Sequence, residues 1–205
     1  MRELSLNLLD IAQNAVTADA SLIEIDIIEN TAKGEMLITM SDNGKGMTPE
    51  QVQKVTDPFF TTRTTRKIGM GIPLFKMAAE MTAGNFSVSS QINAGTKITA
   101  LFNTRSIDFP PLGDMGSTLA ALIAMNTHID FKYRHVVDTN ELILHTSELK
   151  QMLGEVPLSE PAVFEWIKEY IGEQTLALNP EGSAPYHDKN AGDTPAPDNS
   201  DERND

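Results

Sequence analysis

The sequence has no cysteine, so it can form no disulfide bond, thiolate metal site or cysteine nucleophile. Long apolar runs are also missing. The longest one near the middle of the chain, residues 119–125, is far shorter than the about 20 residues that span a bilayer. The start, Met1-Arg2-Glu3, does not have the pattern of a signal peptide, because acids and amides interrupt the apolar residues that follow. We therefore expect a cytoplasmic protein that does not contact a membrane.

Basic residues are few. Lysine and arginine number 16 against 29 aspartates and glutamates, and the resulting formal net charge of −13 argues against nucleic acid as a direct partner. The four histidines show no metal-ligand spacing, and we expect them to be structural or exposed. Positive charge gathers at Arg63, Arg66 and Lys67, where the charge of a triphosphate would be neutralised.

Residues 1–104 predict a domain of mixed helices and strands. Apolar residues between Leu4 and Val16 follow the rhythm of an amphipathic helix. Strands are predicted at 22–29 and 36–41, a short helix after Pro49, a loop, a helix at 72–81, and a closing hairpin of 85–92 and 96–102. These elements predict an α+β fold, a two-layer α/β sandwich with one sheet covered on one side by helices.

Two further segments follow this domain. Pro110-Pro111 marks a boundary within residues 105–178, an α/β extension with a helix at 114–125, a hairpin of 129–137 and 141–145, a helix opened by Ser147, and a helix at 160–171. The extension is either a substrate-docking or dimerising module or a scaffold that enlarges the core. Residues 179–205 contain almost no large apolar side chain, and we expect a disordered acidic tail.

The segment Asp42-Asn43-Gly44-Lys45-Gly46-Met47 directly follows a predicted strand. A carboxylate at a strand end can accept the exocyclic amine of adenine, and glycines allow positive φ and close approach of a ligand. The alternative is an ordinary exposed turn, because Asn-Gly and Lys-Gly pairs are common turn sequences.

Three polar residues, Asn7, Asp10 and Asn14, lie near one face of the first predicted helix. The side-chain carbonyl of Asn14 could bind magnesium, which prefers oxygen ligands. Asp10 could accept a proton from a water or hydroxyl that attacks a phosphate. The alternative is a solvated helix face.

Two more motifs lie downstream. Residues 57–63 place Phe59-Phe60 before hydroxyl and cationic side chains, and Gly69 and Gly71 stand at the start of a predicted helix. Backbone N–H groups at a helix N-terminus that glycine leaves uncovered form an anion site. The alternatives are a surface loop for the basic residues and core packing for the aromatic pair.

In this order, the four elements resemble the superfamily of gyrase, the heat-shock chaperone, histidine kinases and the mismatch-repair ATPase. Residues 10–15 resemble its N box, 42–47 its first glycine box, 57–63 the phenylalanine box of histidine kinases, and 69–71 its second glycine box. The resemblance covers residues 1 to about 104.

This resemblance implies a Bergerat-type ATP-binding fold with ATP and Mg²⁺ as cofactors. It implies that Asn14 binds the metal, Asp42 reads adenine, Gly44 and Gly46 line the base pocket, and Asp10 is the catalytic residue. Gly69 and Gly71 would wrap the phosphates. Further nucleotide contacts are expected from Met47, Phe60, Thr61, Thr62, Arg63, Lys67, Met70 and Thr96.

Two departures from the superfamily affect the expected activity. Its hydrolytic members usually carry glutamate where this chain has Asp10, and the shorter side chain should hold an attacking water less well. The hairpin that bears the phosphoaccepting histidine of histidine kinases is not expected here. The sequence thus favours a signalling kinase, a transferase that phosphorylates a separate protein. The alternatives are an ATPase or ATP-gated switch in which nucleotide drives homodimerisation, and a non-catalytic ATP-sensing module.

Overall fold

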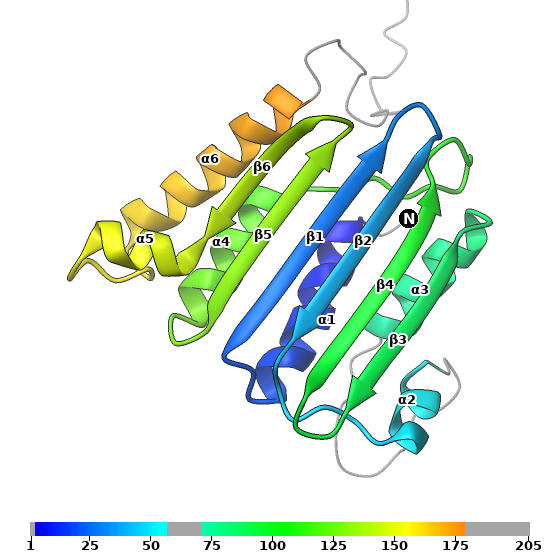
Figure 1. Cartoon of the computed structure of the whole chain (residues 1–205). Coiled ribbons are helices and arrows are strands. Elements are labelled where there is room, and N and C mark those ends of the chain that lie inside the picture. The colour runs from blue at the N-terminus through cyan, green and yellow to red at the C-terminus, as the bar shows by residue number, and fades with distance from the viewer. Residues whose placement is uncertain (1–2, 57–70, 179–205) are drawn as a thin grey trace, which may run out of the picture.

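The computed structural model of the chain describes residues 3–56 and 71–178, in which six strands form one mixed sheet. The strand order is β3-β4-β2-β1-β5-β6 (Figure 1). None of the helices in these two ranges is long and apolar enough to cross a membrane. The elements in chain order are α1 (Leu4–Thr17), β1 (Leu22–Asn30), β2 (Glu35–Asp42), α2 (Pro49–Val55), α3 (Gly71–Met81), β3 (Asn85–Gln91), β4 (Gly95–Asn103), α4 (Met115–Met125), β5 (Asp130–Val137), β6 (Asn140–His145), α5 (Thr146–Leu153) and α6 (Pro161–Leu178).

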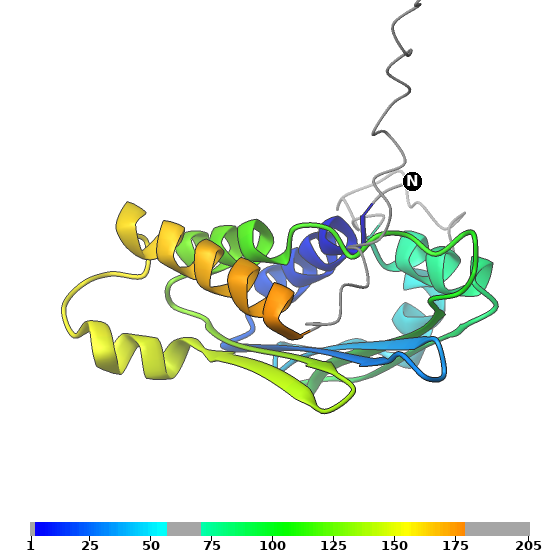
Figure 2. The same cartoon turned by 90° about the horizontal axis from the view of Figure 1, so that it is seen from above.

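The α+β sandwich predicted from the sequence is confirmed. Alternate residues in the first part of β1, namely Ile23, Ile25 and Ile27, are buried, and β2 shows the same alternation. This period of two places the apolar side chains on one face of the sheet. Helices α1, α3, α4 and α6 cover that face (Figure 2).

The extension continues the sheet of the first hundred residues. Strand β5 pairs in parallel with β1, with Leu22 opposite Asp130, whereas all other strand pairs are antiparallel. Helix α4 contacts both α1 and α6, and buried residues from both parts of the chain belong to one hydrophobic cluster. The two parts therefore share a sheet and a core.

The connection between β4 and α4 holds the beginning of α1. Leu4 N donates to the Pro111 carbonyl (2.9 Å) and Ser5 N donates to the Leu112 carbonyl (2.8 Å). The residue before α1, Glu3, makes no side-chain capping bond. Backbone carbonyls from the start of the extension thus satisfy N–H groups that a helix N-terminus leaves unpaired.

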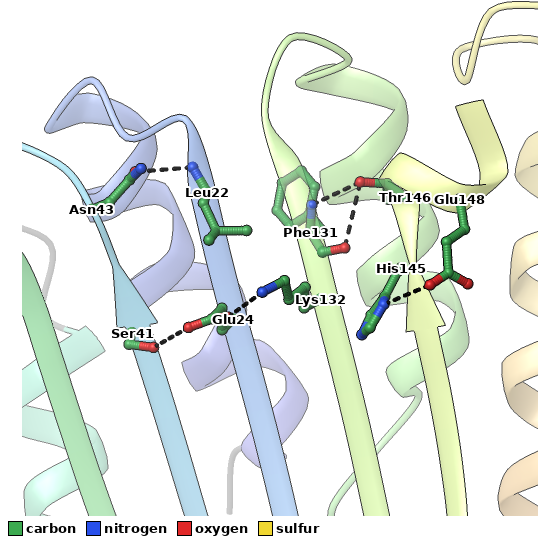
Figure 3. A network of polar contacts seen from close by, with 9 residues as sticks. All are labelled: Leu22, Glu24, Ser41, Asn43, Phe131, Lys132, His145, Thr146 and Glu148. Atoms are coloured by element: carbon green, nitrogen blue, oxygen red, sulfur yellow. Dashed lines mark hydrogen bonds and ion pairs between the residues drawn. The ribbon is translucent and has the colours of Figure 1, made fainter. Parts of the chain in front are cut away.

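Polar contacts link strands on the face of the sheet opposite the helices. Glu24 on β1 accepts hydrogen bonds from Ser41 on β2 (3.2 Å) and from Lys132 on β5 (2.8 Å), as Figure 3 shows. The hydrogen bond and positive charge of Lys132 lower the pKa of Glu24. One carboxylate therefore connects three neighbouring strands, including the two that join the extension to the rest of the sheet.

A buried polar group lies on the helix-covered face of the same junction. The side chain of His135 is almost fully buried; its Nε2 lies 2.8 Å from Glu29 Oε1, and its Nδ1 lies 3.3 Å from the Tyr133 hydroxyl. Burial raises the pKa of Tyr133, so its hydroxyl keeps its proton and can donate to the imidazole. These pairings satisfy both ring nitrogens, as the burial of a histidine requires.

Candidate functional site

Asp42 is the last residue of β2, and its carboxylate is half-buried at the edge of the site. One carboxylate oxygen, Oδ1, accepts a hydrogen bond from Gly44 N (2.8 Å). Burial raises the pKa of Asp42, while hydrogen bonds from the backbone N–H groups of Gly44 and Thr96 oppose that rise. A carboxylate has about four lone-pair sites, so Asp42 keeps acceptor capacity for a ligand amine.

The loop after Asp42 rests on the end of α1. A Cβ added to Gly44 would lie 2.7 Å from the Ala18 carbonyl oxygen, so this position admits only glycine without a shift. Lys45 N donates to the same carbonyl (2.9 Å). The first glycine box is thus fixed against the C-terminal end of α1.

Asn43 fastens the same loop to the start of β1. Its Oδ1 accepts hydrogen bonds from Ser21 N and Leu22 N, both at 2.9 Å, and its Nδ2 donates to the Ser21 hydroxyl (2.9 Å). Figure 3 shows the contact with Leu22. These bonds fix the loop that follows β2 without using the carboxylate of Asp42.

A hydroxyl pair connects the loop to the hairpin of β3 and β4. Ser90 Oγ accepts a hydrogen bond from Met47 N (2.9 Å), donates to the Gly95 carbonyl (2.8 Å), and lies 3.0 Å from Thr96 Oγ1. Because Ser90 has one proton, Thr96 must be the donor between the two hydroxyls. Ser90 was not predicted from the sequence, and it is the residue that links Met47 to Thr96.

Two glycines of this region are required by close backbone contacts. Gly46 has a φ of +63°, and an added Cβ would overlap the carbonyl group of Gln91. Gly95 has a φ of +87°, and its Cβ would overlap the carbonyl group of Asp42. At both positions, the backbone of one segment therefore packs directly on the backbone of another, with no room for a side chain between them.

The polar residues of α1 meet the start of α3. A Cβ added to Gly71 would lie 2.6 Å from Asp10 Cβ, so the first turn of α3 packs directly on Asp10. Asn14 is partly buried, and its Nδ2 is buried without a hydrogen-bond partner among the described residues. Such an orphaned amide fits a site whose ligand is supplied from outside the chain.

The structure brings together Asp10, Asn14 and Gly71 on one side, and Asp42, Gly44, Gly46, Met47 and Thr96 on the other. The remaining expected contacts lie outside the described residues. They are Phe60, Thr61, Thr62, Arg63, Lys67, Gly69 and Met70.

A metal at this site would need ligands beyond the protein. Within residues 3–56 and 71–178, no group of three or more histidines, aspartates and glutamates could hold an ion. Magnesium usually binds through one or two side-chain oxygens together with substrate phosphates and water. The side-chain carbonyl oxygen of Asn14 is a ligand of this kind, provided that the phosphates of a nucleotide complete the coordination.

Comparison with known proteins identifies the family. Residues 1–106 match the family model described as "Histidine kinase-, DNA gyrase B-, and HSP90-like ATPase". This match includes more than half of the chain, and the chain therefore belongs to that family and contains its ATP-binding domain. The superfamily inferred from the four sequence motifs is confirmed.

Two relatives are similar to the same half of the chain. A "Putative sensor protein" of Shewanella frigidimarina (strain NCIMB 400) is 28% identical over 103 residues, which are 50% of this chain and 15% of the relative. "Sensor histidine kinase YvrG" of Bacillus subtilis (strain 168) is 31% identical over 93 residues, which are 43% of this chain and 16% of the relative. The matched region is thus about a sixth of the length of these relatives.

One solved structure supports the fold. The crystal structure of the N-terminal domain of a DNA repair protein aligns with a TM-score of 0.51 and 15% sequence identity. The alignment covers 71% of this chain and 53% of the other chain.

Proposed function

We propose that this protein binds ATP with magnesium and transfers the terminal phosphate to a separate protein, as a cytoplasmic signalling kinase. The observation that carries the proposal is the packing of Gly71 on Asp10, which places the start of α3 beside the polar face of α1. A helix N-terminus attracts phosphate, and Asp10 can accept a proton from an attacking group there. The similarity to a sensor histidine kinase supports transfer over other uses of ATP.

Each residue of the site would have one role. Asp42 would accept the adenine amine, because its carboxylate keeps free acceptor positions beside the glycine loop. Asn14 would bind the magnesium ion through its side-chain carbonyl oxygen, and its unpaired Nδ2 would donate a hydrogen bond to a phosphate. Magnesium, when bound, neutralises phosphate charge. Positioning and charge neutralisation account for most of phosphoryl transfer, so few chemical groups suffice.

The rival function is an ATP-gated switch with slow or no transfer. The hydrogen bonds from Leu4 and Ser5 to carbonyls of the connection before α4 favour it, because they join the helix of the site to the extension. A movement of α1 on nucleotide binding would then shift the extension, residues 105–178, through these hydrogen bonds. In this case the extension, rather than a phosphorylated partner, would transmit the signal, for example through a homodimer.

Nucleotide binding is tested by thermal unfolding with and without Mg-ATP. Ligand at 100 times its Kd should stabilise the protein by about 2.7 kcal/mol. Asp42→Asn should weaken ATP binding and change the preference over GTP, because a mispaired buried group costs about 1 to 3 kcal/mol. Asn14→Ala should remove mainly the magnesium-dependent part. A folded protein that shows no shift at millimolar Mg-ATP would refute the proposal.

Transfer is tested with radiolabelled ATP and candidate partner proteins from the native host. We expect slow hydrolysis by the protein alone, and phosphorylation of a partner that Asp10→Asn reduces. Asp10→Glu, which lengthens the side chain by one methylene, is the matched variant and should raise basal hydrolysis. Fast hydrolysis by the unmodified protein without a partner, or full transfer by Asp10→Asn, would favour the rival function.

A further inference from the structure

Asn7 is a buried polar residue for which the proposed function has no role so far. It lies on α1, is 3% exposed, and its Oδ1 is buried without a hydrogen-bond partner in the part of the chain that the structure describes. An unpaired buried carbonyl costs about 1 to 3 kcal/mol. A position that keeps this cost in the nucleotide-free protein is a candidate for a contact made only when ligand is present.

Helix geometry aligns Asn7 with the residues of the site. At 3.6 residues and 5.4 Å per turn, Asn7 and Asn14 differ by only about 20° around α1 and by about 10.5 Å along it. Asp10 lies between them, about 4.5 Å along the axis from Asn7. The three side chains therefore form one polar stripe, with Asn7 at its N-terminal end.

The contacts of the site give the direction in which a nucleotide lies on this stripe. The loop of Asp42 rests on Ala18 at the C-terminal end of α1, so the base belongs at that end. Gly71, at the start of α3, packs on Asp10 further toward the N-terminus, so the phosphates point that way. Asn7 is the next polar group of α1 beyond Asp10 and lies toward the terminal phosphate.

We propose that Asn7 positions the terminal phosphate of ATP through water. Its Oδ1 accepts a hydrogen bond from a water molecule that hydrates the γ-phosphate, and this donor pairs the carbonyl that is orphaned without nucleotide. The inference rests on the proposed ATP binding and adds a determinant of the preference for ATP over ADP. ADP has no γ-phosphate, so its affinity should not depend on Asn7.

The test is calorimetric titration of ATP and ADP in the presence of magnesium, together with melting of the nucleotide-free protein. Asn7→Leu replaces the amide by an apolar side chain of similar size. It should reduce the preference for ATP over ADP about fivefold, the equivalent of one hydrogen bond of about 1 kcal/mol. ADP affinity should change less than twofold, and the melting temperature without nucleotide should rise, because an unpaired buried group is removed.

Thr175→Val is the matched control. Thr175 Oγ1, on α6, is also buried without a partner among the described residues, and valine has nearly the same shape. This variant should raise the melting temperature of the nucleotide-free protein as well, but leave the ratio of ATP to ADP affinity unchanged. The comparison therefore separates two effects: the stability gained when an unpaired buried polar group is removed, and the affinity lost when a contact with the nucleotide is removed.

A second variant keeps the test decisive if the leucine protein does not fold. Asn7→Asp retains a side-chain oxygen but adds negative charge toward the γ-phosphate, so it should also lower the preference for ATP over ADP. A wild-type protein that binds both nucleotides equally, or variants that keep the wild-type ratio, would overturn the role of Asn7 and leave ATP binding intact. A wild-type protein that binds neither nucleotide would refute the proposed function itself.

Discussion

Gly46→Ala should destabilise the protein more than a positive φ alone explains. The left-handed backbone at Gly46, with a φ of +63°, costs alanine about 1 to 2 kcal/mol. In addition, the new Cβ would overlap the carbonyl group of Gln91, which is backbone and cannot rotate away. The loop must therefore lift from the hairpin of β3 and β4.

Lifting the loop breaks two hydrogen bonds of the site. Met47 N donates to Ser90 Oγ (2.9 Å), and Asn93 N donates to the Lys45 carbonyl (2.8 Å). Each hydrogen bond contributes about 0.5 to 1.5 kcal/mol. Together with the backbone strain, the free energy of unfolding should fall by roughly 2 to 5 kcal/mol.

Gly154→Ala is the control for strain without a clash. Gly154 has a φ of +60°, but an added Cβ would meet nothing within 4 Å. Its backbone, with φ +60° and ψ −113°, is strained for alanine, so the free energy of unfolding, measured by urea denaturation, should fall by only about 1 to 3 kcal/mol. Equal losses for Gly46→Ala and Gly154→Ala would refute the argument from the Gln91 contact, and unchanged ATP affinity in a folded Gly46→Ala protein would contradict the role of this loop in binding.

Two further predictions concern the same site. Gly71→Ala should lower the free energy of unfolding by about 1 to 3 kcal/mol and weaken ATP binding, because its Cβ would press on Asp10 Cβ at 2.6 Å. Gly172→Ala on α6, where nothing lies within 4 Å, should instead stabilise the protein by about 0.5 to 1 kcal/mol; the opposite order in urea denaturation would contradict both assignments. Burial raises the pKa of Asp42 above its unfolded value, so its contribution to stability is fully present below the unfolded pKa and is lost as pH rises through the folded pKa. Asp42→Asn should therefore raise the melting temperature of the nucleotide-free protein at pH 7 but not below the ordinary aspartate pKa of about 3.9; a gain that is the same at both pH values would show that ionisation of Asp42 has no part in it.

Periodicity in the sequence was enough to locate most helices and strands. The alternation along β1 and β2 and the three-and-four spacing along α1 are properties of neighbouring residues. Where both ends of an element were predicted, the observed ends lie within a few residues of them. The exception is α6, which was expected to end at Ile171. The helix continues through Gly172 to Leu178, whose side chain is buried and whose carbonyl accepts a hydrogen bond from Asn140 Nδ2 (3.0 Å).

Residues that act by bridging distant segments were not predicted. Ser90 bonds to Met47 across 43 positions of the chain, and its neighbours in sequence give no sign of that contact. The place of β5 was missed for the same reason: the hairpin of β5 and β6 was recognised, but its pairing with β1 depends on strands about 108 residues apart. Motifs identify groups whose chemistry is local, whereas pairing partners depend on the whole sheet.

The parallel pairing of β1 with β5 has a consequence for synthesis of the chain. Strand β1 has β2 on one side, and its other edge waits for residues 130–137. Ribosomes add about 5 to 20 residues per second, so that edge stays unpaired for roughly 5 to 20 s after β1 is made. This unpaired edge belongs to β1, in which isoleucines alternate with other residues, and such an exposed edge strand pairs readily with other chains. We expect nascent chains that stop at the end of the family match, near residue 106, to aggregate or to recruit chaperones, and chains that extend beyond β5 to escape both.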